Sequence, residues 1–203
     1  MLYLSGHKSP TIAADLAAGT IGLLNTPRSR YLLDGVAVWA ADNGAFTGQY
    51  PGDDAFMSWL ETLAEHRGRC LFVAAPDVVG DAAATLALLP GMAARISAAG
   101  WPVALVGQDG MEHADVPWHL VEWLFVGGST EWKLGASAST LIRQAQAAGK
   151  RVHVGRVNSG KRFRLFAGLD CDTADGTFLA FGCDVNAPTV RDWSTAPVQG
   201  VIA

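Results

Sequence analysis

The chain has 203 residues, of which 50% are hydrophobic and 17% are charged, and its formal net charge is −4. This length and apolar content predict a single domain, residues 1–203, with a sizeable core. The negative net charge argues against a protein that coats nucleic acid without selectivity. The apolar runs are shorter than the roughly 18 residues that span a bilayer, and the first residues lack the basic segment of a signal peptide. We therefore expect a cytoplasmic protein with no membrane contact.

The cysteines are three in number and include no Cys-x-x-Cys pair: Cys70, Cys171 and Cys183. An odd count without such a pair argues against a disulfide framework and against a structural zinc site. We expect no metal and no cofactor.

Eight apolar runs recur along the chain, and each runs into a polar residue or glycine. They are Leu2–Ser5, Gly22–Asn25, Val36–Asp42, Leu71–Asp77, Val103–Gln108, Trp123–Gly128, Val152–Arg156 and Leu165–Asp170. Near-continuous apolar runs are typical of strands that are buried on both faces, as in parallel sheets.

Helical patterns lie between many of these runs. The strongest is Asp53–His66, where Phe56, Leu60 and Leu63 form an apolar stripe. Other helices are expected at Thr11–Ala18 (with Ser9 as N-cap), Asp81–Ala99 and Ala138–Ala148, and short ones at Arg28–Leu33, Val116–Glu122, Ser159–Phe163 and Thr189–Trp193. The alternation predicts an α/β fold, a compact (β/α)8 barrel with some short or missing helices. A doubly wound open sheet is the alternative.

Basic residues are concentrated between Trp132 and Gly168, where no acidic residue interrupts them. They are Lys133, Arg143, Lys150, Arg151, Arg156, Lys161, Arg162 and Arg164. Such a run is either a solvated helix face or a strip that binds phosphates.

Polar residues and glycines follow the predicted strands, where the chemistry of parallel α/β folds collects. In chain order they are Asp42, Asn43, Gly44, Phe46, Asp77, Gln108, Gly127, Gly128, Arg156, Asp170, Asp172 and Asp175. Any single Asp after a strand is most simply a cap or turn former. Together, two facing carboxylates can cleave a bond at an anomeric carbon, and Asp and Gln suit the edge of a purine. His153 fits a hydrogen-bonded core histidine, whereas Trp132 could stack on a base.

The ordered motifs DNGAF (42–46), PD (76–77), VGQDG (106–110), VGGS (126–129) and GLDCD (168–172) resemble the tRNA-guanine transglycosylase superfamily. Members are (β/α)8 barrels that exchange guanine for a 7-deazaguanine. The resemblance implies that Asp42 is the general acid/base and that Asp172 is the nucleophile. The matching segment is one residue shorter than the family's, so Asp175 is the rival nucleophile and Asp170 is structural. Base contacts are implied for Asp77, Gln108, Gly127, Gly128, Asn43, Gly44 and Phe46.

The tRNA enzymes of this family carry a Cys3His zinc site and a C-terminal extension, and this chain has no such cluster. Its compact form resembles the phage-type branch that inserts 7-deazaguanines into DNA. The resemblance thus implies exchange of guanine in DNA for a preQ0-like base, with tRNA less favoured, in the host cytoplasm if the protein is phage-encoded. Lys133, Arg156, Lys161, Arg162 and Arg164 would bind phosphates.

Three other functions are compatible with the sequence: a nucleoside deoxyribosyltransferase, a glycoside hydrolase, and a non-catalytic nucleic-acid-binding module. The first two need carboxylates but no basic strip, and the third would use the acids only as caps and turns. The sequence leaves a homodimer open.

Overall fold

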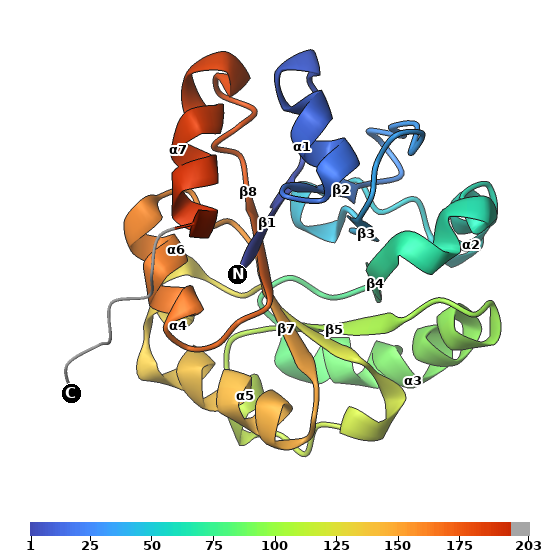
Figure 1. Cartoon of the computed structure of the whole chain (residues 1–203). Helices are drawn as coiled ribbons and strands as arrows, with labels where there is room; N and C mark the ends of the chain where they lie inside the picture. Colours follow the sequence, from blue (N-terminus) through green and yellow to red (C-terminus); the bar gives the residue numbers. More distant parts are fainter. Residues whose placement is uncertain (196–203) are drawn as a thin grey trace.

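The computed structural model describes residues 1–195 and contains a closed barrel of eight parallel strands that are neighbours in chain order (Figure 1). The strands are β1 (Leu2–Ser5), β2 (Gly22–Asn25), β3 (Trp39–Ala41), β4 (Cys70–Ala74), β5 (Val103–Gly107), β6 (Trp123–Val126), β7 (Arg151–Val154) and β8 (Thr173–Gly176). The predicted (β/α)8 barrel is therefore confirmed, and the open sheet is excluded. Positions 196–203 of the predicted domain lie outside the described residues.

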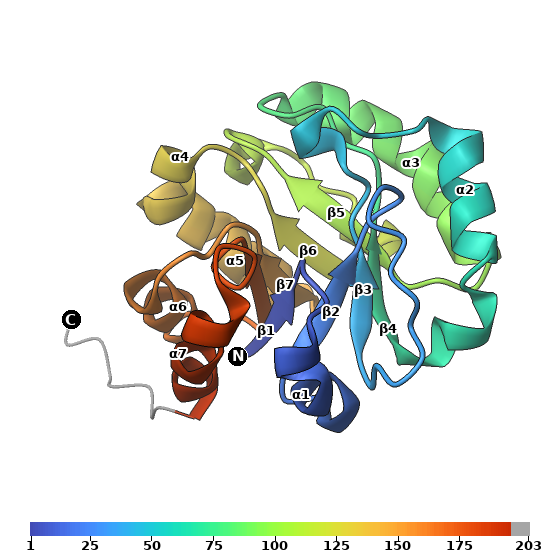
Figure 2. The ribbon, with the colours of Figure 1, turned by 90° about the horizontal axis from the view of Figure 1, so that it is seen from above.

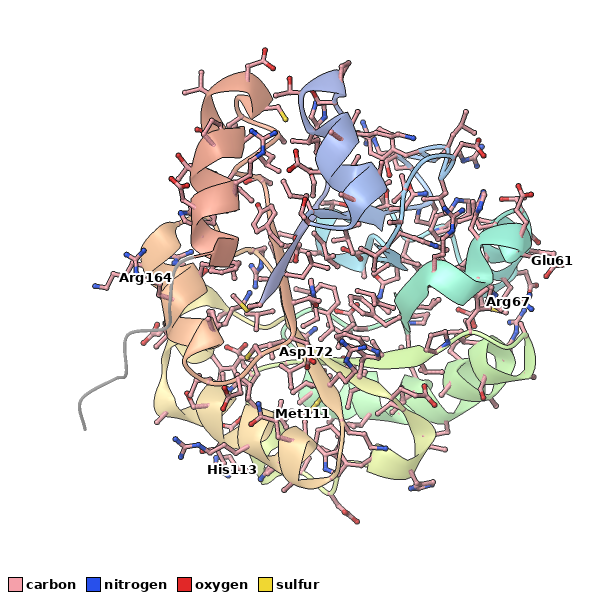
Figure 3. The ribbon with its side chains drawn as sticks, in the orientation of Figure 1. Glu61, Arg67, Met111, His113, Arg164 and Asp172 are labelled. Atoms are coloured by element: carbon pink, nitrogen blue, oxygen red, sulfur yellow. The ribbon has the colours of Figure 1, made fainter. Side chains whose placement is uncertain are left out.

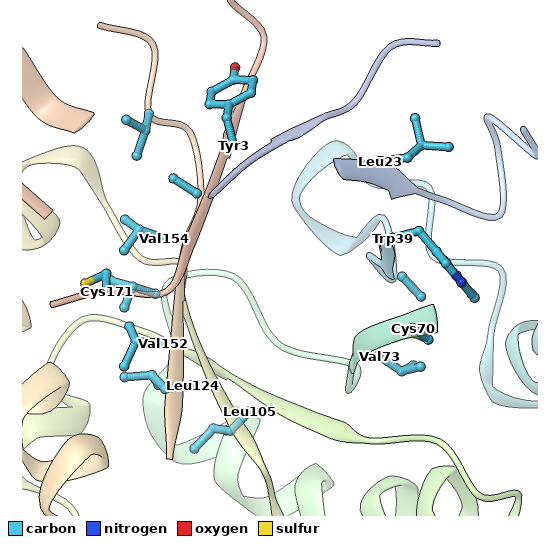
Figure 4. Packing of buried hydrophobic residues seen from close by; sticks show 14 of the residues in the cluster. Tyr3, Leu23, Trp39, Cys70, Val73, Leu105, Leu124, Val152, Val154 and Cys171 are labelled. Atoms are coloured by element: carbon cyan, nitrogen blue, oxygen red, sulfur yellow. The ribbon is translucent and has the colours of Figure 1, made fainter. Parts of the chain in front are cut away.

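Alternate residues of each strand face two different cores, as the period of a β-strand requires. One set, which includes Phe72, Trp123 and Phe125, fills the barrel interior. The other set, which includes Leu105 and Leu124, packs outside the barrel (Figure 4). Because both faces are covered, the strands read as continuous apolar runs.

Helices surround the strands on the outside of the barrel (Figure 2). They are α1 (Ala13–Ala18), α2 (Asp53–Glu61), α3 (Ala82–Ala98), α4 (Thr130–Leu134), α5 (Ala136–Ala147), α6 (Gly160–Ala167) and α7 (Cys183–Thr195). Short 3-10 turns add η1 (Pro10–Ile12), η2 (Ala45–Thr47), η3 (Ala64–Arg69), η4 (Met111–His113) and η5 (Trp118–Leu120). No α-helix separates β2 from β3 or β5 from β6 among the described elements. Short or missing helices were predicted in general, but the two short helices expected between these strands do not form: Arg28–Leu33 is a turn followed by irregular chain, and Val116–Glu122 contains only the 3-10 turn η5.

The last strand lies later in the chain than predicted. Leu165–Asp170 was expected to be a strand, but Leu165 belongs to α6, which buries Phe163 and Phe166 on one face. The side chain of Ser159 caps this helix by accepting from the amide of Arg162. The true β8 has the sequence Thr-Ala-Asp-Gly, and it pairs with β1 and β7 without any long apolar side chain.

No helix within residues 1–195 is both long enough and apolar enough to cross a membrane.

Candidate active site

A cavity of about 580 Å³ opens where the strands end at their carboxyl termini. Its walls come from the segments that follow or end β2 to β8. All seven residues predicted to contact a base line it: Asn43, Gly44, Phe46, Asp77, Gln108, Gly127 and Gly128. Asp42 and Asp175 line it too. The structure therefore brings together motifs that are spread over more than 130 positions of sequence.

Asp42 directly follows β3 and faces two other acids. Its Oδ1 accepts a hydrogen bond of 2.9 Å from the amide of Gly44, which holds the carboxyl group in the turn. Burial, reinforced by the charges of Asp175 and Asp77, raises the pKa of Asp42 to about 6. A carboxyl group with such a pKa can both donate and accept a proton near neutral pH.

Asp77 is held between two amide side chains. Its Oδ1 accepts from Asn43 Nδ2 at 2.9 Å, and its Oδ2 accepts from Gln108 Nε2 at 2.7 Å. Asn43 also donates to the carbonyl of Ala75, and Gln108 Oε1 accepts from the amide of Gly80. Burial raises the pKa of Asp77. Because each carboxylate oxygen has a second lone pair, this fixed group can still accept from a flat ligand with adjacent N–H donors.

Asp175 is the third residue of β8 and is hydrogen-bonded to a buried histidine. The distance from its Oδ1 to His153 Nε2 is 3.0 Å, and the other ring nitrogen of His153 lies 2.8 Å from Thr173 Oγ1. His153 sits inside the barrel on β7, with no exposed surface. Sequence reasoning predicted a hydrogen-bonded core histidine but missed its acidic partner. The signal was present, because His153 is a polar residue at an inward position of an apolar strand.

Asp172, the predicted nucleophile, lies at the opposite end of β8. It precedes the strand, where its Oδ2 accepts from the amide of Val152 at 2.7 Å and its Oδ1 accepts from Arg151 Nε at 3.1 Å. Figure 3 labels it near the start of β8. Three residues of extended chain separate it from Asp175, about 10 Å, and an odd spacing turns the two side chains to opposite faces. The prediction that Asp172 attacks the substrate is therefore wrong for this cavity.

The Gly127–Gly128 pair is packed too tightly to carry side chains. A Cβ on Gly128, whose φ is +56°, would lie 2.5 Å from both Asp109 Oδ1 and Trp132 Cε3. Asp109 also accepts from the amide and the hydroxyl of Ser129, both at 2.6 Å, which fixes the turn. The ring of Trp132 is buried under the turn and donates to Glu112. It is therefore not free to stack on a base, contrary to expectation.

Arg156 stands over the ring of Phe46 at the cavity. Its guanidinium carbon is 4.2 Å from the ring centroid, and its Nη2 donates to the carbonyl oxygens of Gly127 and Gly128. Phe46 is 59% exposed, so its ring is an open stacking surface apart from this contact. Burial lowers the pKa of Arg156, yet the guanidinium stays charged at any ordinary pH.

The predicted phosphate-binding residues do not form one strip. Arg162 lines the cavity with Arg156, and so does Arg28, which follows β2 and was not predicted. Lys161 and Arg164 are exposed on α6 but do not line the cavity, and Arg164 extends from its outer side (Figure 3). Lys133 is 5% exposed, so it is not a surface contact for a phosphate.

Lys133 is instead buried behind the wall of the cavity. Its ammonium group donates to the carbonyl of Gly155, next to Asp175. Burial, with help from the positive charge of Arg156, lowers the pKa of Lys133 to about 7. The correction follows from packing: α4 is one short turn that directs Lys133 inward, which a count of basic residues does not reveal.

Among residues 1–195, no group of three or more His, Cys, Asp and Glu is arranged to hold a metal ion.

No protein-family model matches the sequence, and a search among curated proteins finds no match. Solved structures do resemble the chain. A protein of Amycolatopsis orientalis, solved as the BexX/CysO complex, has a TM-score of 0.57 at 17% identity, covering 99% of this chain and 94% of that one. The 3-hexulose-6-phosphate synthase of Salmonella typhimurium gives 0.53 at 14% identity, with 95% and 96% covered.

A mandelate racemase/muconate lactonizing protein of Herpetosiphon aurantiacus has a TM-score of 0.51 at 14% identity, covering 87% of this chain and 54% of that one. At these identities the likeness establishes the barrel fold and leaves the chemistry to the residues of the cavity.

Proposed function

We propose that the protein is a base-exchange transglycosylase that replaces guanine in DNA with a 7-deazaguanine such as preQ0. The observation that carries the proposal is the joint lining of one cavity by Asp42, Asp175 and the Asp77–Gln108 pair. Two carboxylates provide a nucleophile and a proton carrier, and the clamped acid with its amide neighbour provides a purine-binding edge. The order of the motifs along the chain supports the same reading.

In the first step, an oxygen of Asp175 attacks C1′ of the target nucleotide. The C1′–N9 bond breaks, and its electron pair leaves with the guanine, which takes a proton from Asp42. In the second step, N9 of the incoming 7-deazaguanine attacks C1′ and releases the Asp175 carboxylate, while the N9 proton passes to Asp42. Both residues end in their starting states. The raised pKa of Asp42 suits this two-way proton transfer.

Three arginines at the cavity favour a polymeric substrate. Arg28 and Arg156 come from the segments after β2 and β7, and Arg162 comes from helix α6. Guanidinium groups bind phosphates well, and C1′ chemistry in a duplex requires the nucleotide to be flipped out or single-stranded. Phosphates on either side of an extruded nucleotide would meet these side chains.

The test uses guanine-containing DNA and tRNA with two labelled bases, preQ0 and guanine. Label entering DNA supports the proposal, and labelled guanine reports exchange even when preQ0 is not the natural base. Asp175→Asn and Asp42→Asn should each abolish incorporation. Asp172→Asn, the matched control just before the same strand, should retain it. If neither base enters DNA or tRNA, the proposal is wrong.

A second candidate is base exchange on free nucleosides. It is favoured by the finding that Lys133, Lys161 and Arg164 do not line the cavity, which leaves fewer phosphate contacts than predicted. Comparing deoxyguanosine with a short oligonucleotide separates the two: a nucleoside enzyme would act on both at similar rates and would not respond to Arg162→Ala.

A further inference from the structure

We propose that His153 is a positioning residue that binds one oxygen of Asp175 and leaves the other oxygen to attack the substrate. The inference rests on the proposed function, in which Asp175 forms the covalent intermediate. It adds a residue in the barrel interior, beneath the cavity, to the machinery of the reaction.

Three consecutive contacts carry the inference. His153 on β7 pairs in register with Thr173 on β8. Thr173 and Asp175 are two residues apart on β8, so their side chains point to the same face of the strand. The imidazole lies between them, with Nδ1 2.8 Å from Thr173 Oγ1 and Nε2 3.0 Å from Asp175 Oδ1.

These contacts select one tautomer. A neutral imidazole has one donor and one acceptor nitrogen, and an ionised carboxylate can only accept. The proton therefore lies on Nε2 and points at Asp175, while Nδ1 accepts the proton of the Thr173 hydroxyl. Burial lowers the pKa of His153, which keeps the ring neutral despite its acidic neighbour.

Aromatic packing fixes the plane of the ring. The centroid of Phe125 lies 4.4 Å from that of His153, and the centroid of Phe72 lies 4.9 Å from it. In this close-packed interior a rotated imidazole would clash with these rings. Asp175 Oδ1 is thus held in place, and Oδ2 is the oxygen left for C1′.

The charges around Asp175 come from every side of the site. The Asp42 carboxyl group acts from β3, the Lys133 ammonium group from α4, and the Arg156 guanidinium group from the loop after β7, while the Tyr3 hydroxyl lies on β1. Two cations and one acid therefore share the surroundings of Asp175 with His153. Against these charges, His153 contributes a directed hydrogen bond rather than a net charge.

The first test does not depend on catalysis. Nitrogen-15 NMR of the imidazole groups reports the tautomer of each histidine, and His153→Asn identifies the signal of His153 by its loss. We expect a neutral ring with the proton on Nε2 at pH 7 and above. A ring that is still protonated at pH 7.5, or that carries its proton on Nδ1, overturns the inference.

The second test compares Thr173→Val with Thr173→Ser. Valine keeps the shape but removes the hydroxyl that donates to Nδ1, and serine keeps the hydroxyl. Groups that orient a reacting residue commonly contribute about 10- to 100-fold to activity, so Thr173→Val should lower kcat by that factor with KM for DNA unchanged. Thr173→Ser, which keeps the hydroxyl, should restore most of the wild-type kcat.

The split between kcat and KM gives a readout that a purely structural role would not move. Loss of the hydrogen bond from Nε2 in His153→Asn should lower kcat while KM for DNA stays unchanged, as in Thr173→Val. If exchange proceeds and Thr173→Val keeps its rate, the inference is overturned while the proposed function stands. If no exchange occurs, the proposed function fails, and the tautomer still decides whether His153 directs its proton at Asp175.

Discussion

Two carboxyl groups share the cavity, and their surroundings divide their roles. Asp175 is bound to the imidazole of His153, whereas Asp42 accepts from backbone amides and faces other acids. The group with the raised pKa suits proton transfer, and the group with a directed donor suits attack. The same surroundings make Asp42 costly to the fold, because its charge is poorly solvated.

Asp42→Asn should therefore stabilise the protein at pH 8. The pKa of Asp42 rises from 3.8 to about 6 on folding, so the ionised group disfavours the folded state. One pKa unit corresponds to about 1.4 kcal/mol, so the gain should be about 1 to 3 kcal/mol, or about 2 to 12 °C in Tm for a domain of this size. Asparagine can still accept the amide of Gly44.

The size of the effect changes with pH in a defined way. Asp42 is neutral in both states well below pH 3.8, so the gain from asparagine should shrink as the pH falls from about 6 to about 4. Thermal unfolding of both proteins at pH 8 and pH 4.5 measures this. An equal gain at both pH values would show that the charge of Asp42 is not the cause.

The same pKa predicts the alkaline limb of catalysis. Departure of guanine needs protonated Asp42, whose population falls tenfold for each pH unit above its pKa. The exchange of labelled guanine into DNA should therefore show a kcat/KM that declines above about pH 6. DNA binding, measured in parallel on Asp42→Asn, should not follow this decline. A kcat/KM that stays constant up to pH 9 would show that Asp42 is not the general acid.

At this scale the sequence predicted the cavity well but favoured Asp172, whereas the structure places Asp175 in the cavity. Asp42, Asp77 and Gln108 each follow a strand whose apolar run is unmistakable, so the rule about strand ends finds them. Asp172 and Asp175 flank or end a strand that has no such run. Without its true bounds, the face and the end of the barrel to which each acid belongs could not be derived.

Among the elements, the turn after β6 is a tightly constrained part of the site. Gly128 combines a positive φ with close contacts to Asp109 and Trp132. Alanine there should cost about 1 to 3 kcal/mol of stability, as expected for strain at a special φ, and should raise KM for the incoming base at least about tenfold because the turn must shift. Differential unfolding and exchange kinetics test both parts.

Gly110→Ala is the matched control. Gly110 also has a positive φ, of 88°, but no atom lies within 4 Å of a Cβ placed there. Gly110→Ala should lose some stability and keep the wild-type KM for the incoming base. If both variants lose base binding equally, the close contacts of Gly128 are not what shapes the site.

Helix α6 provides a matched pair of arginines. Arg162 lines the cavity, whereas Arg164, half a turn further on, does not. Arg162→Ala should weaken DNA binding and reduce the slope of log affinity against log salt by about one, as expected for one lost phosphate contact. Arg164→Ala should leave both unchanged. Equal losses of DNA affinity in the two variants would show that the phosphate site includes the outer face of α6.

The sequence could not show that Arg162 lines the cavity while Arg164 and Lys133 do not. A run of basic residues predicts positive charge, and only the turn of the helix decides which side chains meet the cavity. The strand predicted at Leu165–Asp170 was wrong for a related reason. Its apolar residues suit a strand as well as a helix, and the burial of Phe163 and Phe166 on one face decides for α6.

At the scale of the whole molecule, the first and last segments of the chain are in contact. Strand β8 pairs with β1 along its length, and α7 is joined to α1 by Arg191. Its Nη2 donates to Asp15 Oδ2 at 2.7 Å, and its Nε donates to Asp15 Oδ1 at 3.1 Å. The barrel order was predictable because repeated strands and helices admit few right-handed arrangements. The ion pair between Arg191 and Asp15, which we call the clasp, was not predictable from the sequence, since no local pattern marks this contact between distant segments.

Asp15→Asn should therefore destabilise the whole domain. The two-point contact is partly exposed, so about 1 kcal/mol is expected at pH 7. The hydrogen bonds from Arg191 hold the pKa of Asp15 below its usual 3.8. The contribution is thus present above pH 3.8 and is lost as the pH falls below that value, so wild type and variant should converge as the pH falls further.

Asp54→Asn is the control for this clasp. Asp54 forms one 2.7 Å contact with Arg95, between α2 and α3, and its side chain is 96% exposed. Removing it should change stability by less than about 0.5 kcal/mol. Because α7 and α1 flank the β1–β8 closure, Asp15→Asn should also speed hydrogen exchange in β1 and β8 before other strands. Exchange that rises uniformly, or a loss no larger than that of Asp54→Asn, would show that the clasp does not hold the barrel closed.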